Sequence, residues 1–315
     1  CTLAYVKKLK ICLTTTFLLF LVTLTQAQDP LPQVVSGRIE RIANFQSRYV
    51  TARNVDVWLP EGYSSGKRYS VLYMHDGQML FDSTVTWNKQ SWDVDELAAR
   101  LMKSAQVPGF IVVGVWNGGA TRFPDYFPQR PFEMLTKTER DTLVASLQKM
   151  GRTQEVFQPK SDDYLRFLVE ELKPYIDMTY AVHKDASHTF VAGSSMGGLI
   201  SMYAICEYPK VFGGAACLST HWPGSFSLNN NPVPDAFVNY LRKHLPKPAS
   251  HRIYFDCGDQ TLDALYPAIQ RRADEVMREA GFTEANWITR YFPGADHSER
   301  AWKRRLEIPL LFLLK

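Results

Sequence analysis

Short runs of hydrophobic residues alternate along the chain with longer segments in which hydrophobic residues recur every three or four positions. The run 110–115 is almost entirely apolar, which predicts a strand of a parallel sheet that is covered on both faces. In the segment 161–177, Leu165, Leu168 and Leu172 have helical spacing and predict a helix. The other predicted strands are 37–42, 54–60, 69–74, 188–191, 213–218, 252–257 and 286–291, and the other predicted helices are 91–102, 199–206, 234–244, 262–280 and 297–314. Two strands that read as antiparallel, followed by repeated strand–helix alternation, predict an α/β fold with one mostly parallel central sheet and helices on both faces.

The segment 117–160 interrupts this alternation. It follows a predicted core strand and is rich in aromatic residues and arginine, as in Arg122-Phe123 and Tyr126-Phe127. Long insertions of this kind often contribute to binding sites, so we expect a cap-like insertion at about 117–160 within a single domain that spans 28–315. The alternative is that the segment has only a structural role and that its aromatic side chains pack into the core.

The turn between the strand at 188–191 and the helix at 199–206 contains Gly193-Ser194-Ser195-Met196-Gly197, a Gly-x-Ser-x-Gly pattern. Between a strand and a helix, this pattern is typical of a nucleophile elbow, in which the glycines make room for a strained serine. The turn also places Ser195 at a helix N-terminus, where free N–H groups favour a developing oxyanion. A Gly/Ser-rich turn of an ordinary α/β protein would have the same sequence, so the interpretation requires partner residues.

A serine nucleophile needs a base, and the base needs an acid that holds it in one tautomer. In the chain order serine, acid, histidine, only His297 follows the last predicted strand, so it is the candidate base. Two acids follow the strand at 252–257, Asp259 and Asp263. We favour Asp263, because Asp259 comes directly after a glycine and could equally cap the helix that follows.

An oxyanion hole requires two backbone N–H donors. Met196, the residue after the serine, supplies one, and the loop after the third strand supplies the other through Gln78 or Gly77. For the substrate pocket we propose aromatic and polar residues near these loops: Trp116, Arg122, Tyr126, Phe127, His221 and Trp222. The sequence shows no His, Asp or Glu cluster with metal-ligand spacing and no glycine-rich loop suited to a phosphate, so we expect neither a metal nor a cofactor.

The first 27 residues have the pattern of an export signal, with a basic start, an apolar stretch and Thr25-Gln26-Ala27 as a cleavage site. The apolar stretch is too short and too rich in threonine for a membrane span. Removing the segment takes away three lysines and no acids, which lowers the formal net charge from +4 to +1 and leaves no electrostatic case for nucleic acid as a partner. Three cysteines then remain without a Cys-x-x-Cys pattern, so we expect buried thiols in a periplasmic or secreted protein.

Together these motifs resemble the "Putative esterase" family of α/β-hydrolases, which includes enterochelin esterases, feruloyl and acetyl-xylan esterases, S-formylglutathione hydrolases and mycolyltransferases. The resemblance rests on the segments 71–82, 87–88, 125–128, 193–198, 262–266 and 294–299, and on Trp302. It implies an α/β-hydrolase fold and ester hydrolysis through an acyl-enzyme on Ser195, with His297 as base, and it supports Asp263 as the acid. The run at 75–82 looks most like the enterochelin-esterase branch and the secreted carbohydrate esterases. That likeness implies a small-molecule or oligosaccharide ester as substrate, either a carbohydrate-linked acetyl or feruloyl ester or a siderophore-type ester.

Two other functions remain open. An acyltransferase would keep the same triad and differ only in excluding water from the acyl-enzyme. A non-catalytic binding protein on the hydrolase fold would be expected to lack Ser195 or His297, and both are present.

Overall fold

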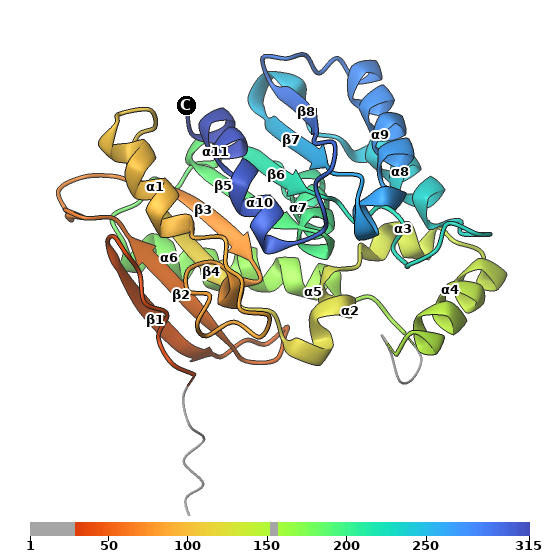
Figure 1. Ribbon diagram of the computed structural model, residues 1–315, viewed down its shortest axis with the longest axis horizontal. Helices are drawn as coiled ribbons and strands as arrows, with labels where there is room; N and C mark the ends of the chain where they lie inside the picture. The colour runs from red at the N-terminus through yellow and green to blue at the C-terminus, as the bar shows by residue number, and fades with distance from the viewer. Residues whose placement is uncertain (1–28, 152–156) are drawn as a thin grey trace, which may run out of the picture. The chain divides into compact units, whose positions relative to one another are not determined.

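The structure, a computed structural model, describes residues 29–151 and 157–315, so the predicted signal segment 1–27 lies outside the described residues (Figure 1). Within Leu31–Lys315, eight strands form one sheet in the order β1-β2-β4-β3-β5-β6-β7-β8. The strands are β1 (Arg38–Phe45), β2 (Arg53–Leu59), β3 (Ser70–His75), β4 (Phe110–Val115), β5 (Thr189–Ser194), β6 (Gly214–Leu218), β7 (Arg252–Cys257) and β8 (Trp287–Tyr291). The β1–β2 and β2–β4 pairs are antiparallel, and every other neighbouring pair is parallel. The predicted mostly parallel sheet is therefore confirmed.

The predicted helices are present in the predicted order, with local differences, and α2, α3 and α4 lie in addition within the segment 117–160. They are α1 (Val94–Lys103), α2 (Arg122–Tyr126), α3 (Gln129–Glu133), α4 (Lys137–Lys149), α5 (Ser161–Arg166), α6 (Lys173–Thr179), α7 (Met196–Glu207), α8 (Val233–His244), α9 (Pro267–Glu279), α10 (Glu299–Arg305) and α11 (Glu307–Leu314). A π-helical stretch, Phe167–Leu172, joins α5 to α6, and a 3-10 turn, Thr261–Leu265, precedes α9. The helix expected at 297–314 is divided into two, because Pro309 has no N–H to donate to the carbonyl of Arg305.

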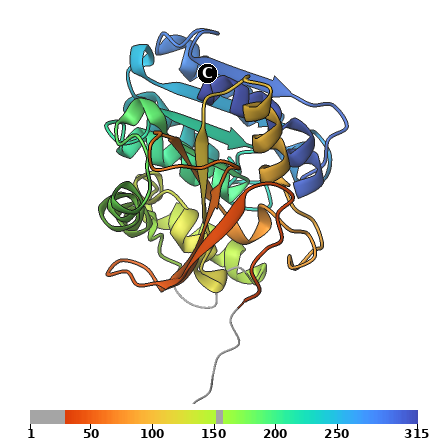
Figure 2. The same cartoon turned by 90° about the vertical axis from the view of Figure 1, so that its left-hand side faces the viewer.

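Helices cover both faces of the sheet. Along β3, Val71 and Tyr73 belong to the core cluster that includes residues of α5 to α9, whereas Leu72 and Met74 belong to the cluster that includes residues of α1, α10 and α11. This division follows from the alternation of side chains along a strand. Figure 2 shows α1 and the C-terminal helices on one side of the strands and the green helices α5 to α7 on the other. Because both faces are covered, β3 and β4 are buried along their whole length.

The segment 117–160 contains α2, α3 and α4. Its Phe123 and Phe127 are buried and pack against each other and against Phe157. Phe127 also contacts Phe237 on α8, with ring centres 5.4 Å apart. Much of the aromatic surface in this segment therefore contributes to the core.

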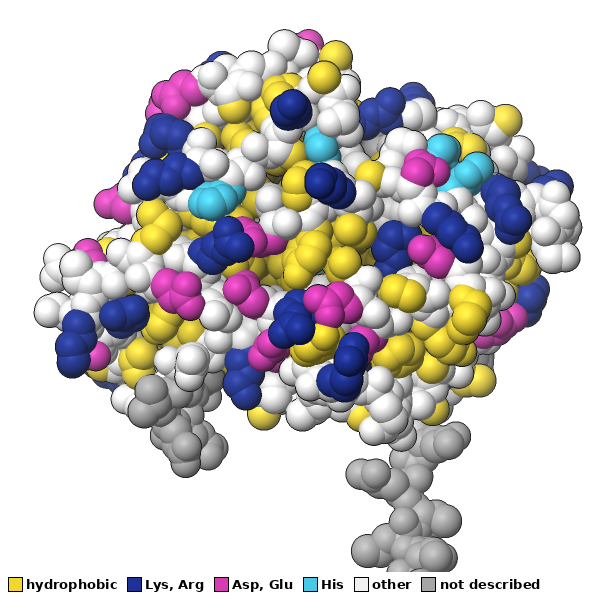
Figure 3. Space-filling model, turned by 180° about the vertical axis from the view of Figure 1, so that it is seen from behind, with side chains coloured by type: hydrophobic (Ala, Val, Ile, Leu, Met, Phe, Trp, Pro, Cys, Tyr) yellow, Lys and Arg dark blue, Asp and Glu magenta, His cyan; other side chains and the backbone are white. Residues whose placement is uncertain are grey.

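Charged side chains of both signs share the surface. On the face drawn in Figure 3, basic and acidic side chains lie close to one another with hydrophobic side chains between them, and neither sign forms a continuous field. Within the part of the chain that the structure describes, no helix has the length and hydrophobicity to cross a bilayer. Cys206, Cys217 and Cys257 are buried free thiols.

Candidate active site

Ser195 lies in a sharp turn between β5 and α7. Its backbone has φ 57° and ψ −122°, a strained conformation for a residue with a side chain. Its N–H donates to the carbonyl oxygen of Leu218 at the end of β6 (3.0 Å). A Cβ on Gly193 would lie 2.7 Å from the carbonyl carbon of Gly197, so the close crossing of strand and helix requires glycine. Because α7 begins at Met196, the serine side chain stands at the N-terminus of a buried helix.

The imidazole of His297 is paired with the carboxylate of Asp263, with 2.5 Å between Nδ1 and Oδ1. Asp263 is buried in the turn that follows β7, and His297 lies in the loop between β8 and α10 with 14% of its side chain exposed. Trp302 on α10 packs edge-on against the imidazole, with ring centres 4.9 Å apart. Because Nδ1 faces the carboxylate, Nε2 is the nitrogen left to accept a proton.

The second carboxylate oxygen of Asp263 accepts two further hydrogen bonds, from the Ser219 hydroxyl (2.6 Å) and from the Gly258 N–H (2.6 Å). Burial raises the pKa of Asp263, but the hydrogen bonds and the neighbouring His297 outweigh this effect and leave the pKa below its usual range. Asp263 is therefore ionised at neutral pH and can stabilise a positive charge on His297.

Asp259, the other candidate acid, does not contact the imidazole. Its carboxylate accepts hydrogen bonds from the Tyr291 hydroxyl (2.7 Å) and the Gly294 N–H (2.8 Å), and its own N–H donates to the carbonyl of Ala295 (3.1 Å). These bonds tie the end of β7 to the loop that contains His297. Of the two acids that the sequence leaves open, the geometry favours Asp263 as the partner of the base.

The buried Arg305 orients the hydroxyl of Ser219, which donates to Asp263. Arg305 Nη2 donates to Ser219 Oγ (2.6 Å) and to Asp256 Oδ1 (2.9 Å), and Trp302 Nε1 also donates to Ser219 Oγ (3.0 Å). With two donors aimed at its oxygen, the Ser219 hydroxyl directs its own proton to Asp263.

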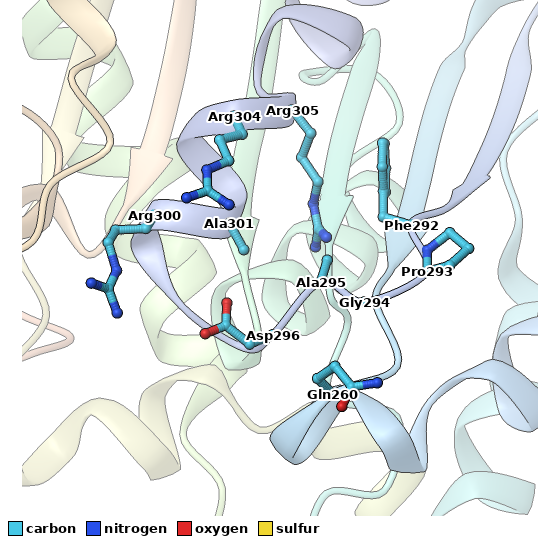
Figure 4. Close-up of a pocket in the computed structure, with 10 residues that line it drawn as sticks. All are labelled: Gln260, Phe292, Pro293, Gly294, Ala295, Asp296, Arg300, Ala301, Arg304 and Arg305. Atoms are coloured by element: carbon cyan, nitrogen blue, oxygen red, sulfur yellow. The ribbon is translucent and has the colours of Figure 1, made fainter.

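A cavity of about 480 Å³ lies beside α10 and the loop that precedes it. In Figure 4 the guanidinium group of Arg305 points toward Ala295, whereas that of Arg304 points to the side where Asp296 lies. Arg305 is only 3% exposed, whereas Arg304 is on the surface. Nothing in the basic run 303–305 distinguishes the buried arginine from its exposed neighbours, so its position could not be predicted from the sequence.

Arg305→Met is expected to lower the free energy of unfolding by roughly 3 kcal/mol at pH 8, because Asp256 would keep a buried negative charge without its partner. Burial raises the pKa of Asp256 to about 6. Ionisation of a group whose pKa is raised on folding destabilises the folded state as the pH rises through that value, so the loss should be smaller at pH 5, where the group can protonate. Urea denaturation at both pH values measures the effect. Arg304→Met, at the exposed neighbouring position, is the control, and an equal loss at the two pH values would contradict the charge explanation.

The hydroxyl of Tyr266 links the nucleophile to His221. It is hydrogen-bonded to the Ser195 side chain and lies 2.8 Å from His221 Nδ1. Burial raises the pKa of Tyr266 well above its usual value, so the phenol stays protonated at neutral pH. Tyr266 was not predicted as a site residue. It follows the candidate acid in an apolar stretch, and nothing in that sequence indicates contact with Ser195.

Tyr266→Phe is expected to lower kcat/KM for small aryl esters about five- to tenfold, since one hydrogen bond to the Ser195 hydroxyl is lost at a cost of about 1 kcal/mol. Steady-state kinetics on p-nitrophenyl acetate measures this. Tyr240→Phe is the matched control, because it removes the hydroxyl of another buried tyrosine, bonded to Glu207, and should leave the rate unchanged. Wild-type kinetics in Tyr266→Phe would show that this bond does not position the nucleophile.

The loop after β3 is held by an ion pair. Asp76 has φ 58° and accepts two hydrogen bonds from Arg122 (2.6 and 2.8 Å) and one from Asn117 Nδ2 (2.7 Å). Burial raises the pKa of Asp76, but Arg122 and Asn117 outweigh this effect and hold it below its usual range. A Cβ on Gly77 would lie 2.4 Å from the backbone of Gly114, so the turn also requires glycine at this position.

A cavity of about 570 Å³ opens beside Ser195 and His297. Met196 and Gln78 also line it, so the N-terminus of α7 and the turn after β3 face the same space, while Gly77 is buried beneath that turn. Polar and aromatic side chains complete the lining, among them Trp87, Asn88, Asn117, Phe123, Phe226 and Glu299. The arrangement brings a strained serine, an acid-paired imidazole and two candidate oxyanion donors to one solvent-accessible pocket.

Two of the six residues expected in the substrate pocket, Arg122 and His221, line this cavity. The other four do not: Trp116, Tyr126, Phe127 and Trp222. Three of these are fully buried, and Trp116 donates its indole N–H to Asp56 (2.8 Å). The structure therefore places them in the protein's framework. Trp87, which the sequence did not suggest as a pocket residue, is 84% exposed at the cavity.

Comparison with known proteins identifies the family and the fold of this chain. A family model described as "Putative esterase" matches residues 47–312. "Uncharacterized protein YbbA" of Bacillus subtilis is 23% identical over 255 residues, which cover 79% of this chain and 87% of that protein. The endo-1,4-beta-xylanase/feruloyl esterase of Xylanibacter ruminicola is 25% identical over 282 residues, which cover 86% of this chain and 30% of that protein. The CE1 ferulic acid esterase of Anaeromyces mucronatus, solved in complex with ferulic acid, superposes with a TM-score of 0.59 at 18% identity, covering 91% of this chain and 95% of that one. The predicted α/β-hydrolase fold is confirmed.

Proposed function

The chain belongs to the Esterase family and is a carboxylic ester hydrolase, and we propose that it acts through a triad of Ser195, His297 and Asp263. Ser195 Oγ attacks the ester carbonyl carbon while His297 Nε2 takes the hydroxyl proton. Asp263, ionised and bonded to Nδ1, stabilises the imidazolium that forms. The tetrahedral intermediate then breaks the bond to the alcohol oxygen, and the alcohol leaves with the proton from His297. Water repeats these steps on the acyl-enzyme, which releases the carboxylic acid and restores Ser195.

The negative oxygen of the intermediate needs donors that are already in place. We assign these to the backbone N–H of Met196 and to that of Gln78 or Gly77. Met196 stands at the N-terminus of α7, and the turn that contains the other two is fixed by the ion pair between Asp76 and Arg122. Donors held in this way require no rearrangement as charge develops, which is the main source of rate acceleration in acyl transfer.

The observation that supports the triad most strongly is the contact between His297 and Asp263 at the cavity that Ser195 lines. The test is hydrolysis of p-nitrophenyl acetate and its longer-chain homologues by the purified protein. We expect measurable turnover with an initial burst when deacylation is slow. A folded wild-type protein that hydrolyses none of these esters would contradict the proposed mechanism.

For the natural substrate we propose carbohydrate-linked acetyl or feruloyl esters ahead of siderophore-type esters. The support is the exposed indole of Trp87 at the cavity, because a flat apolar surface at the mouth of a polar pocket suits a sugar ring. The Xylanibacter ruminicola relative is also named a feruloyl esterase. Acetylated xylan, feruloylated oligosaccharide and a catecholate siderophore ester are to be assayed in parallel, and faster hydrolysis of the siderophore would contradict this order.

Trp87→Ala is expected to raise KM for a feruloylated oligosaccharide about tenfold and to leave p-nitrophenyl acetate kinetics unchanged, because only the longer substrate reaches the indole. Steady-state kinetics on both esters measures this split. Met178→Ala is the matched control, since Met178 is 79% exposed at the end of α6 and does not line the cavity. An equal change on both substrates would argue against a role for Trp87 in binding the sugar.

Export is a further proposal, and it rests on the pattern of the first 27 residues. Expression of the whole chain in a bacterial host followed by cell fractionation tests it. Recovery of a shortened protein in the periplasm or medium is expected, and a full-length protein retained in the cytoplasm would contradict it.

A further inference from the structure

Three potential metal ligands lie together at the end of β5 opposite Ser195. His183, Asp185 and His188 belong to the segment between α6 and β5, and their ligand atoms all lie within 4.8 Å of one another. The sequence spacing His-x-Asp-x-x-His did not indicate a site. The 3-10 turn Ala186–His188 folds the segment back and brings the two histidines together.

The three side chains already interact. The imidazole rings of His183 and His188 are stacked with centres 4.0 Å apart, and Asp185 Oδ1 lies 2.7 Å from His188 Nδ1. The Ser187 hydroxyl donates to the same carboxylate oxygen (2.5 Å) and limits its rotation. Because the side chains of Asp185 and His188 are about half exposed, at 54% and 40%, an ion can reach them from solvent.

We propose that His183, Asp185 and His188 bind a divalent transition-metal ion, with Zn²⁺ as the best match. Two imidazole nitrogens and one carboxylate oxygen are a donor set that Zn²⁺ takes in proteins, and three protein ligands leave a fourth position for water. Mg²⁺ and Ca²⁺ prefer sets made only of oxygen, so the two histidines disfavour them. In a tetrahedral site the ligand atoms lie about 3.3 Å apart. Because the three side chains are partly exposed, small rotations can bring their ligand atoms from within 4.8 Å to that separation.

The consequence of such a site is structural. The N–H of His183 donates to the carbonyl of Tyr69 before β3 (3.0 Å), and the Thr189 hydroxyl at the start of β5 donates to the carbonyl of Asp185 (2.9 Å). A bound ion would therefore stabilise the segment 183–188, which contacts the start of β3 and the start of β5. A six-residue strand such as β5 is about 20 Å long, so the ion is too far from Ser195 to act on the ester. Metal that binds the folded chain more tightly than the unfolded chain raises its thermal stability.

Isothermal titration of the untagged protein with zinc chloride tests the proposal. We expect one Zn²⁺ per chain, with affinity reduced at least about tenfold in His183→Ala and in His188→Ala. His244→Ala, which removes a partly exposed histidine at the end of α8, is the matched control and should bind as the wild type does. Zinc should raise the Tm of the wild type and of the control, and should not raise that of the His183→Ala/His188→Ala double variant.

A spectroscopic measurement identifies the ligands directly. With Cu²⁺ in place of Zn²⁺, the electron paramagnetic resonance spectrum should show nitrogen coordination that the double variant loses. Equal zinc affinity in the wild type and the double variant would place the ion elsewhere and overturn the proposal. Absence of binding at millimolar zinc would overturn it as well.

Discussion

Replacement of Ser195 by alanine is expected to lower kcat/KM for p-nitrophenyl acetate by about 10⁴-fold or more, because the hydroxyl that forms the acyl-enzyme is gone while the cavity and its donors remain. Steady-state kinetics measures the loss, and urea denaturation verifies that the variant is folded. Stability should change little, since the hydroxyl contributes one hydrogen bond, to Tyr266.

The matched control for this substitution is Ser201→Ala. Ser201 lies on α7 about one turn beyond Gly197, and its hydroxyl donates to the carbonyl of Gly197 (2.7 Å). Its loss should leave kcat/KM within a factor of about three. If Ser195→Ala kept activity within tenfold of the wild type, the nucleophile would have to be another residue.

Asp263→Asn is expected to reduce kcat about 10³- to 10⁴-fold, since an amide facing His297 Nδ1 no longer holds the tautomer whose Nε2 accepts the serine proton. Asp259→Asn changes a carboxylate that contacts Tyr291 and the Gly294 N–H, so its effect should stay below about tenfold. Kinetics on both variants, together with their unfolding free energies, separates the two roles. The reverse order of losses would transfer the role of the acid to Asp259.

Much of the framework could be predicted because its signals are local. β4 coincides with the run 110–115, since a strand covered on both faces needs apolar residues throughout. The glycines at 193 and 197 mark the elbow because the structure leaves no room for a side chain at the first of them. His297 could be proposed as the base from chain order alone, because each candidate residue follows a strand whose end faces the same edge of a parallel sheet.

What could not be predicted depends on tertiary packing. Asp259 and Asp263 are four positions apart, and only the turn after β7 decides which carboxylate meets the imidazole. Periodicity shows that Tyr126 and Phe127 are aromatic residues near a loop, but it cannot show whether they line a pocket or fill the core, and both are buried. No periodic pattern of hydrophobic residues surrounds Trp87, because the loop that contains it has no regular structure, so its exposed position could not be predicted.

The residues that support Asp263 could not be predicted from the sequence for the same reason. Ser219 and Arg305 are far apart in the sequence and meet only where the end of β6 lies beside α10. A serine after a strand and an arginine in a basic run are each typical of an exposed surface. Their contact shows how the protein holds Asp263 ionised and oriented in a buried place.

The most direct test of Ser195 as nucleophile is the mass of the intact protein after reaction with a fluorophosphonate, followed by peptide mapping. If Ser195 is the nucleophile, a single covalent adduct is expected on the peptide that contains it, and none on Ser195→Ala. A folded wild-type protein that remains unlabelled, or an adduct on a different residue, would contradict this assignment.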